Sequence, residues 1–286
     1  MKFGVMFANV GPYVQPDMAA ALGQIAEEHG FESLWAVEHV VVPAGYESRY
    51  PYSPTGRMPG PEESPIPDPL IWLTWVGAAT TTLHLATGIL ILPQRNPVIL
   101  AKELATLDVL SGGRVELGVG VGWLREEFDA LGIPFEERGA RTDEYVEALR
   151  TLWRDEEPCF DGQFASFDRA KCFPQPTQGS IPIHVGGHTT AAARRAGRLG
   201  DGFFPGRSTD DELVPLLETM RASAKDAARD ADAIEVTAGG VMDLAGVRRF
   251  ADYGVDRLVL PPLGWDLDTL REQLGRFSEQ VIEKSR

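Results

Sequence analysis

The sequence has few cysteines, no excess of positive charge and no short metal-binding motif, and each absence excludes a class of protein. Two cysteines in 286 residues are too few for a disulfide framework, so we expect Cys159 and Cys172 to be free thiols in a reducing cytoplasm. A net charge of −15 argues against nucleic acid and anionic membranes as partners. No spacing of Cys and His predicts a bound metal.

Residues 69 to 94 contain no Asp, Glu, Lys or Arg, which is long enough to suggest a membrane span. Three threonines and His84 interrupt the middle of this stretch. We therefore interpret it as a buried helix, Pro69–Thr81, followed by a buried strand of a parallel sheet, and we expect no membrane segment. The N-terminus from Met1 to Phe7 is too short for a secretory signal.

The stretch from Ile181 to Thr190 predicts a strand, a tight turn and a helix start. Alternating aliphatic residues precede Gly186, Gly187 and His188. Glycines let backbone N–H groups approach a ligand, and the start of a helix adds unpaired N–H groups and the positive end of the helix dipole. Such a site usually binds phosphate. The alternative interpretation is a plain turn without a ligand.

Eight predicted strands are each followed by a predicted helix. This alternation indicates a parallel sheet, and eight units of this length predict an α/β fold of the (β/α)₈ TIM-barrel type, as one domain over residues 1–286. A doubly wound open sheet is the alternative, but no Gly-x-Gly-x-x-Gly follows the first strand. The predicted strands are Lys2–Asn9, Ser33–Val37, His84–Leu92, Arg114–Val119, Ile181–Val185, Gly200–Phe204, Ala233–Ala238 and Arg257–Leu260.

Two insertions interrupt the alternation, at about residues 40–68 and 157–178. The first is rich in proline and has no periodicity, and long loops of this kind usually serve a site, so its tyrosines Tyr46, Tyr50 and Tyr52 are candidates to cover a substrate. The second contains several phenylalanines and predicts an aromatic hairpin. We also expect Asp17 to cap the first helix.

Active sites of such barrels lie at the carboxyl ends of the strands, so the residues predicted there are site candidates. They are Asn9, His39, Thr87, Gly88, Ile89, Gly120, Val121, Gly122, Gly186, Gly187, His188 and Gly202. His184, which lies within its strand, is expected to be a core histidine.

Several motifs together resemble the bacterial luciferase-like superfamily. They are Ala26-Glu27-x-x-Gly30-Phe31-x-Ser33-x-Trp35, Glu38-His39, Thr87-Gly88-Ile89-Leu90-x-Leu92-Pro93-x-Arg95-Asn96-Pro97-Val98 and Gly112-x-Arg114-x-x-Leu117-Gly118-x-Gly120-x-Gly122-Trp123. The versions Trp-x-x-Glu-His and Arg-Asn-Pro are most similar to the branch that uses the deazaflavin coenzyme F420 rather than FMN.

The resemblance implies a coenzyme, F420 or alternatively FMN, that lies across the strand ends. It implies that Gly88–Ile89 is a non-proline cis peptide against the back of the ring. It also implies that Gly186, Gly187 and His188 receive the coenzyme's phosphate. Members of this family commonly form homodimers through barrel helices, so we expect one here.

The same resemblance suggests roles for single residues. His39 is the favoured proton donor or acceptor, because imidazole titrates near neutrality. Glu38 is a candidate to orient it, although neighbouring side chains in a strand point apart. Asn9 and Arg95 are candidates for coenzyme contacts, and Trp123 either flanks the ring or packs on the aromatic hairpin.

One difference from the family pattern argues against one class of substrate. The sugar-phosphate dehydrogenases of this family have a glutamate where this chain has Trp123, and an aromatic residue where it has Pro43. The sequence therefore predicts an F420-dependent oxidoreductase that transfers hydride to or from some other small organic substrate. Two alternatives remain: an FMN-dependent monooxygenase that uses O₂ and a separate reductase, and a non-catalytic flavin-binding relative.

Overall fold

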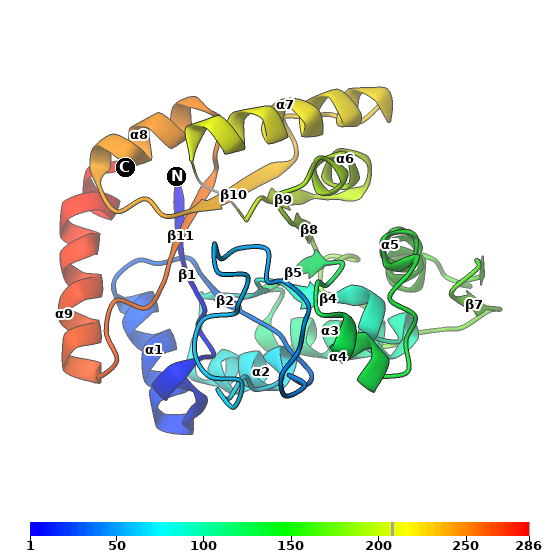
Figure 1. Ribbon diagram of the computed structural model, residues 1–286, viewed down its shortest axis with the longest axis horizontal. Coiled ribbons are helices and arrows are strands. Elements are labelled where there is room, and N and C mark those ends of the chain that lie inside the picture. The colour runs from blue at the N-terminus through cyan, green and yellow to red at the C-terminus, as the bar shows by residue number, and fades with distance from the viewer. Residues whose placement is uncertain (207–208, 286) are drawn as a thin grey trace.

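The computed structural model describes residues 1–206 and 209–285, and at its centre eight parallel strands form a closed barrel (Figure 1). Neighbouring strands follow the order β1-β2-β3-β5-β8-β9-β10-β11, and β11 pairs with β1 to close the ring. The predicted (β/α)₈ barrel is therefore confirmed and the open sheet is wrong. The eight strands are β1 (Lys2–Met6), β2 (Ser33–Ala36), β3 (His84–Thr87), β5 (Val115–Gly120), β8 (Ile183–Gly186), β9 (Gly202–Phe204), β10 (Glu235–Gly239) and β11 (Arg257–Leu260).

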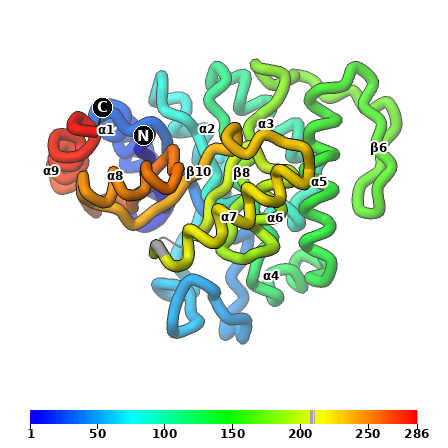
Figure 2. Tube along the Cα trace, turned by 90° about the horizontal axis from the view of Figure 1, so that it is seen from above, coloured from blue at the N-terminus to red at the C-terminus, as the bar shows by residue number. Residues whose placement is uncertain are grey.

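Helices surround the barrel in both views (Figures 1 and 2). They are α1 (Pro16–Glu28), α2 (Pro69–Ala79), α3 (Pro97–Ser111), α4 (Arg125–Ala130), α5 (Arg138–Arg154), α6 (Thr190–Leu199), α7 (Asp210–Asp226), α8 (Leu244–Asp252) and α9 (Leu267–Phe277). Short helical turns are η1 (Gly11–Val14), η2 (Leu92–Gln94), η3 (Ser278–Ile282) and η4 (Glu283–Ser285).

Three local predictions need correction. Asp17 does not cap α1: the N-cap is Gln15, because Pro16 has a backbone preset for the first helical position and starts the helix earlier. The first strand ends at Met6 rather than Asn9. The strand predicted over His84–Leu92 is broken after Thr87 and resumes as β4 (Leu90–Ile91), which pairs only with β5.

Two long segments separate consecutive strands and helices of the barrel. Residues 37 to 68 contain no helix or strand. The second insertion holds an antiparallel hairpin of β6 (Phe160–Asp161) and β7 (Ser166–Phe167), in which the two phenylalanine rings stack with centroids 5.7 Å apart. The hairpin extends away from the barrel in Figure 2.

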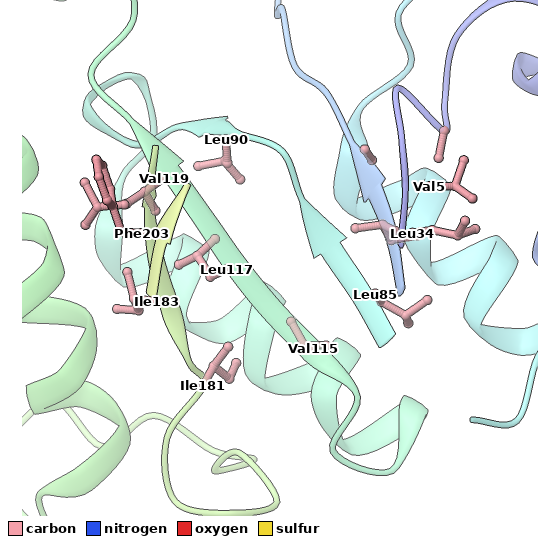
Figure 3. Close-up of a cluster of buried hydrophobic side chains, with 14 of the residues drawn as sticks. Val5, Leu34, Leu85, Leu90, Val115, Leu117, Val119, Ile181, Ile183 and Phe203 are labelled. Carbon is pink, nitrogen blue, oxygen red and sulfur yellow. The ribbon is translucent and has the colours of Figure 1, made fainter. Parts of the chain in front are cut away.

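Strand side chains alternate between the helices and the barrel interior, as the pleat requires. In β5, Val115, Leu117 and Val119 belong to the large core between the barrel and the helices (Figure 3), whereas Glu116 and Gly118 face inward. The middle of the interior is filled by a small separate cluster of Trp35, Ala86, Phe204 and Val259.

The floor of the barrel, at the amino ends of the strands, is polar and centred on Arg257. This fully buried guanidinium pairs with Glu32 at 2.8 Å, with Glu116 at 3.0 Å and with Glu235. Burial acts to raise the pKa of the Glu116 carboxyl, but hydrogen bonds from His184 and His84 and the charge of Arg257 hold that pKa well below its ordinary value. His184 is thus a paired core histidine, as predicted.

Cys159 and Cys172 are both free thiols, as the sequence analysis predicted. Among the helices of the described residues, none combines the length and the apolar character needed to cross a bilayer.

The floor makes folding stability depend on pH through His84. A hydrogen bond to Glu116 raises the pKa of His84 above its ordinary 6.5, so its stabilising contribution is complete below about pH 6.5 and is lost as pH rises through the folded-state pKa. We expect the difference in unfolding free energy between the wild type and His84→Gln to shrink from about pH 6 to about pH 9 in urea titrations. A difference that stays constant or grows with pH contradicts this account, and His29→Gln is the control.

Candidate active site at the barrel mouth

The opposite end of the barrel is built around a bulge after β3. The Gly88–Ile89 peptide bond is cis, as the resemblance implied. The Ile89 side chain lies against two strand-end glycines: a Cβ on Gly120 would meet its Cδ1 at 2.5 Å, and one on Gly186 would meet its Cγ2 at 2.5 Å. Glycines at the ends of β5 and β8 therefore make room for Ile89.

The glycine turn follows β8 directly, but one of its expected donors is already used. Gly187 has a φ of 123°, which disfavours any residue with a side chain, and its N–H donates to the Phe204 carbonyl at 3.1 Å. Thr189 then caps α6 by accepting from the N–H of Ala192. An anion would have to bind other backbone N–H groups at the start of α6, because those of Gly187 and Ala192 already donate within the protein.

His39 is held by a residue that the sequence analysis did not single out. Its Nδ1 lies 3.0 Å from Oε2 of Glu127, a carboxylate of α4 with no exposed surface. The other oxygen of Glu127 accepts from the N–H groups of Val40 at 2.6 Å and Val41 at 3.3 Å. One buried carboxylate thus fixes both the imidazole and the start of the long loop.

A signal for Glu127 is present in the sequence. Leu124, Phe128 and Leu131 have helical spacing, and Glu127 shares their apolar face. An acid on the buried face of a helix needs partners, but the helix pattern alone does not reveal that its partner lies 88 residues away.

Glu38, the predicted orienting group, points to other partners. It is buried, which raises the pKa of its carboxyl, and it accepts hydrogen bonds from Arg95 Nε at 2.9 Å and from the Ile91 N–H. Arg95 also bonds Asp68 at 2.6 Å, so this guanidinium links two carboxylates beside the mouth. Asp68 in turn caps α2.

The long loop crosses the mouth and covers it with aromatic rings. The rings of Tyr46 and Tyr50 meet Trp123 edge-on, with centroids 5.5 and 5.2 Å apart, and Tyr52 meets His188 at 4.7 Å. Trp123 therefore packs on the loop and on His39, whose centroid is 5.6 Å away.

The residue before Glu127 anchors the same loop. Glu126 accepts from the N–H groups of Glu47 at 2.7 Å and Ser48 at 3.0 Å. Two consecutive acids of α4 therefore hold the loop at two points, and the loop's position is tied to that of His39.

Two predicted site residues, Asn9 and Thr87, have hydrogen-bond partners within the protein, and Val121 and Gly122 lie in a connecting segment. The Asn9 amide is fully buried; its Nδ2 donates to the Val37 and Pro67 carbonyls and its Oδ1 accepts from the Val37 N–H, so this side chain fastens the loop. Thr87 donates to the Gly118 carbonyl at 2.7 Å. Val121 and Gly122 lead from β5 to α4, and a Cβ on Gly122 would collide with Phe128.

The expectation that Gly202 lies at the carboxyl end of a strand is wrong. It is the first residue of β9, level with His184, and a Cβ there would lie 1.9 Å from His184 Nδ1. The absence of a side chain at Gly202 leaves room for His184 in the polar floor. The sequence placed the start of this strand two residues too early, at Gly200.

The fold is a parallel eight-stranded barrel with a cis-peptide bulge at its mouth, and comparison with known proteins identifies the family. Residues 1–244 match the family model described as luciferase-like monooxygenase, and the chain belongs to this family.

Curated relatives and a solved structure agree with this assignment. An uncharacterized protein of Mycobacterium tuberculosis, Rv0940c, is 34% identical over 272 residues, which cover 92% of this chain and 94% of the relative. An F420-dependent glucose-6-phosphate dehydrogenase of Kineococcus radiotolerans is 32% identical over 220 residues, 73% of this chain and 60% of that enzyme. The crystal structure of monooxygenase RslO1 from Streptomyces bottropensis has a TM-score of 0.80 at 23% identity and covers all of both chains.

The packing of Ile89 makes a prediction about the bulge. Gly186→Ala places a methyl group against Ile89 and is expected to destabilise the fold by about 1–3 kcal/mol, the usual cost of overpacking. In Gly186→Ala/Ile89→Ala the collision is gone, so the loss should be smaller than the sum of the two single losses. Thermal and urea unfolding of the four proteins measure this coupling, and strictly additive losses would show that the two residues do not touch.

Proposed function

We propose that this protein is an F420-dependent oxidoreductase that transfers hydride between the reduced deazaflavin and a small organic substrate. The observation that carries the proposal is the 32% identity to an F420-dependent dehydrogenase over 220 residues, which cover 73% of this chain. Membership of the family supports a redox reaction at the barrel mouth.

The residues at the mouth fit such a coenzyme. The Ile89 bulge offers an apolar surface for the back of a flat ring, and Gly120 and Gly186 keep that surface free of further side chains. The N–H groups at the start of α6 suit the coenzyme's phosphate. The coenzyme supplies the hydride chemistry, and the protein supplies position and protection from water.

His39 is the proposed proton donor and acceptor. An ionised carboxylate only accepts hydrogen bonds, so Glu127 fixes the neutral imidazole as the Nδ1–H tautomer. Nε2 is then free to take a proton from a substrate, and the protonated ring can return it. In this arrangement Glu127 is a positioning residue.

The side chains around Trp123 argue against a sugar phosphate as substrate. Where the related sugar-phosphate dehydrogenases have a glutamate, this chain has an indole surrounded by His39, Tyr46 and Tyr50. Apart from Glu127, which faces His39, no carboxylate takes the place of that glutamate in the described contacts of this cluster.

An FMN-dependent monooxygenase is the second candidate, and the fold shared with RslO1 favours it. The two proposals differ in the coenzyme and in the use of oxygen. A deazaflavin lacks the nitrogen at which flavins activate O₂, so only the second candidate consumes oxygen.

The homodimer stays a prediction, as does the cytoplasmic location. Large apolar side chains on the outer faces of α2 and α3 support a dimer, since patches of this kind mark association sites. Light scattering in solution would measure the mass. The most exposed of these residues are Ile71, Trp75, Ile99 and Leu110.

The coenzyme assignment is tested by binding. We expect the purified protein to retain F420 but not FMN after incubation and gel filtration, as shown by the visible absorption spectrum of each coenzyme. Oxygen uptake with reduced FMN should stay at the rate of the free flavin. Retention of FMN together with rapid oxygen uptake would overturn the proposal in favour of the monooxygenase.

The role of Glu127 is tested by replacing its carboxylate with an amide. In Glu127→Gln the new N–H₂ group faces Nδ1, so we expect His39 to change to the Nε2–H tautomer and turnover to fall by roughly 10²-fold, while coenzyme binding is unchanged. Nitrogen-15 NMR of histidine-labelled protein reports the tautomer, and with five histidines the spectrum is simple. Glu126→Gln is the control, because it touches the loop but not His39. A wild-type His39 already in the Nε2–H form contradicts the assignment.

A further inference from the structure

A second feature of the site is a cavity of about 370 Å³ on the α3 side of His39. It lies between the end of the long loop, η2, the first turns of α3 and Leu131. Its polar lining comprises Glu38, His39, Asp68, Gln94, Arg95, Glu103 and Asn96, whose side chain caps α3. The proposed coenzyme site at the glycine turn does not include this space, because neither Gly186 nor Gly187 lines it.

Gln94 shows that the cavity is built for a polar guest. Its side chain is only 8% exposed, and neither its Oε1 nor its Nε2 has a hydrogen-bond partner in the structure. A buried amide without partners destabilises a fold, so its presence needs a compensating use. Neither atom is exposed to the cavity, so a ligand there would satisfy the amide only after the Gln94 side chain has turned toward it.

The charged side chains around Gln94 indicate whether the ligand is a cation or an anion. Three carboxyl groups and one guanidinium line the cavity, which leaves two formal negative charges in excess. Arg95 is committed to Glu38 and Asp68. Glu103, at the exposed rim, has no ion pair in the part of the chain that the structure describes.

The other residues that line the cavity indicate the polarity of the uncharged part of the ligand. Ile66, Ile99 and Leu131 are apolar, so part of the cavity offers no ligand atoms to a hydrated metal ion. An anion would meet an excess of like charge. A compact organic cation with an apolar body satisfies the acids, the Gln94 carbonyl oxygen and the apolar walls together.

We propose that this cavity binds an organic ammonium ion with an apolar body, its charged end between Glu103 and Gln94. Binding itself does not depend on the coenzyme. Because His39 lines the same cavity, the site is placed to hold an amine-bearing substrate of the enzyme, and this second step rests on the proposed function.

Binding is tested with benzylammonium chloride as probe, titrated into the full-length protein in a calorimeter. Benzyl alcohol and benzoate have the same ring without the positive charge. We expect benzylammonium to bind about tenfold more tightly than benzyl alcohol, and benzoate not to bind. Equal affinity for the ammonium and the alcohol overturns the proposal.

Variants locate the probe. Glu103→Gln should weaken benzylammonium about fivefold, since this carboxylate lies at the rim. Gln94→Met should weaken it further and also raise Tm, because two unpartnered buried polar atoms are removed. Glu218→Gln, an exposed acid on α7, should change neither. If Glu103→Gln and Glu218→Gln weaken the probe equally, the ammonium binds non-specifically to acidic surface and the site is refuted.

The coenzyme experiment separates this inference from the proposed function. Retention of F420 without benzylammonium binding would refute the cavity alone. Benzylammonium binding that is sensitive to Glu103 and Gln94, in a protein that retains no F420, would leave the cavity site standing and refute the proposed function.

Discussion

The structure depends on how little side-chain volume a closed barrel of eight short strands can hold. Each strand places only one to three side chains inside, so a few residues fill the interior in layers. Arg257 and its carboxylates form the floor, Trp35 and Phe204 the middle, and Ile89 the top. A large side chain in one layer requires a small one beside it, which is why Gly202 faces His184 and Gly120 faces Ile89. The glycines at the mouth are therefore packing requirements first, and a ligand site uses the space they leave.

The second constraint is the buried carboxylate of Glu127. A charge without exposed surface must be matched by hydrogen-bond donors, and here the donors are His39 and the N–H groups of Val40 and Val41. The loop cannot move at this point without uncovering the charge. Glu126 holds the same loop through the N–H groups of Glu47 and Ser48, and Asn9 holds its far end through the Pro67 carbonyl. The segment that carries Tyr50 and Tyr52 lies between these anchors, so the aromatic cover is attached at both ends.

The sequence was sufficient for the fold because strand periodicity and helix caps act over a few residues. It also located the mouth, because strand ends share one face of a barrel. It failed where partners are distant in the chain: Glu127 with His39, Glu38 with Arg95, and Asn9 with Pro67 are pairings that only the fold creates. It also failed at Gly202: the predicted strand starts two residues too early, at Gly200, so Gly202 was not recognised as the first residue of β9. A strand of three residues leaves little pattern from which to tell its start from its end.

The side chains near the proposed reaction centre limit the chemistry on the substrate. On the proposed function, His39 is the group that exchanges a proton with the substrate, because Trp123 offers no acid and burial raises the pKa of Tyr50. One proton and one hydride interconvert a carbonyl and an alcohol, or an imine and an amine. A carbonyl substrate makes no use of the acids beside His39, whereas an amine product carries the positive charge that Glu103 and Asp68 favour. On the proposed function, the charge of this cavity therefore favours carbon–nitrogen over carbon–oxygen bonds as the site of hydride transfer.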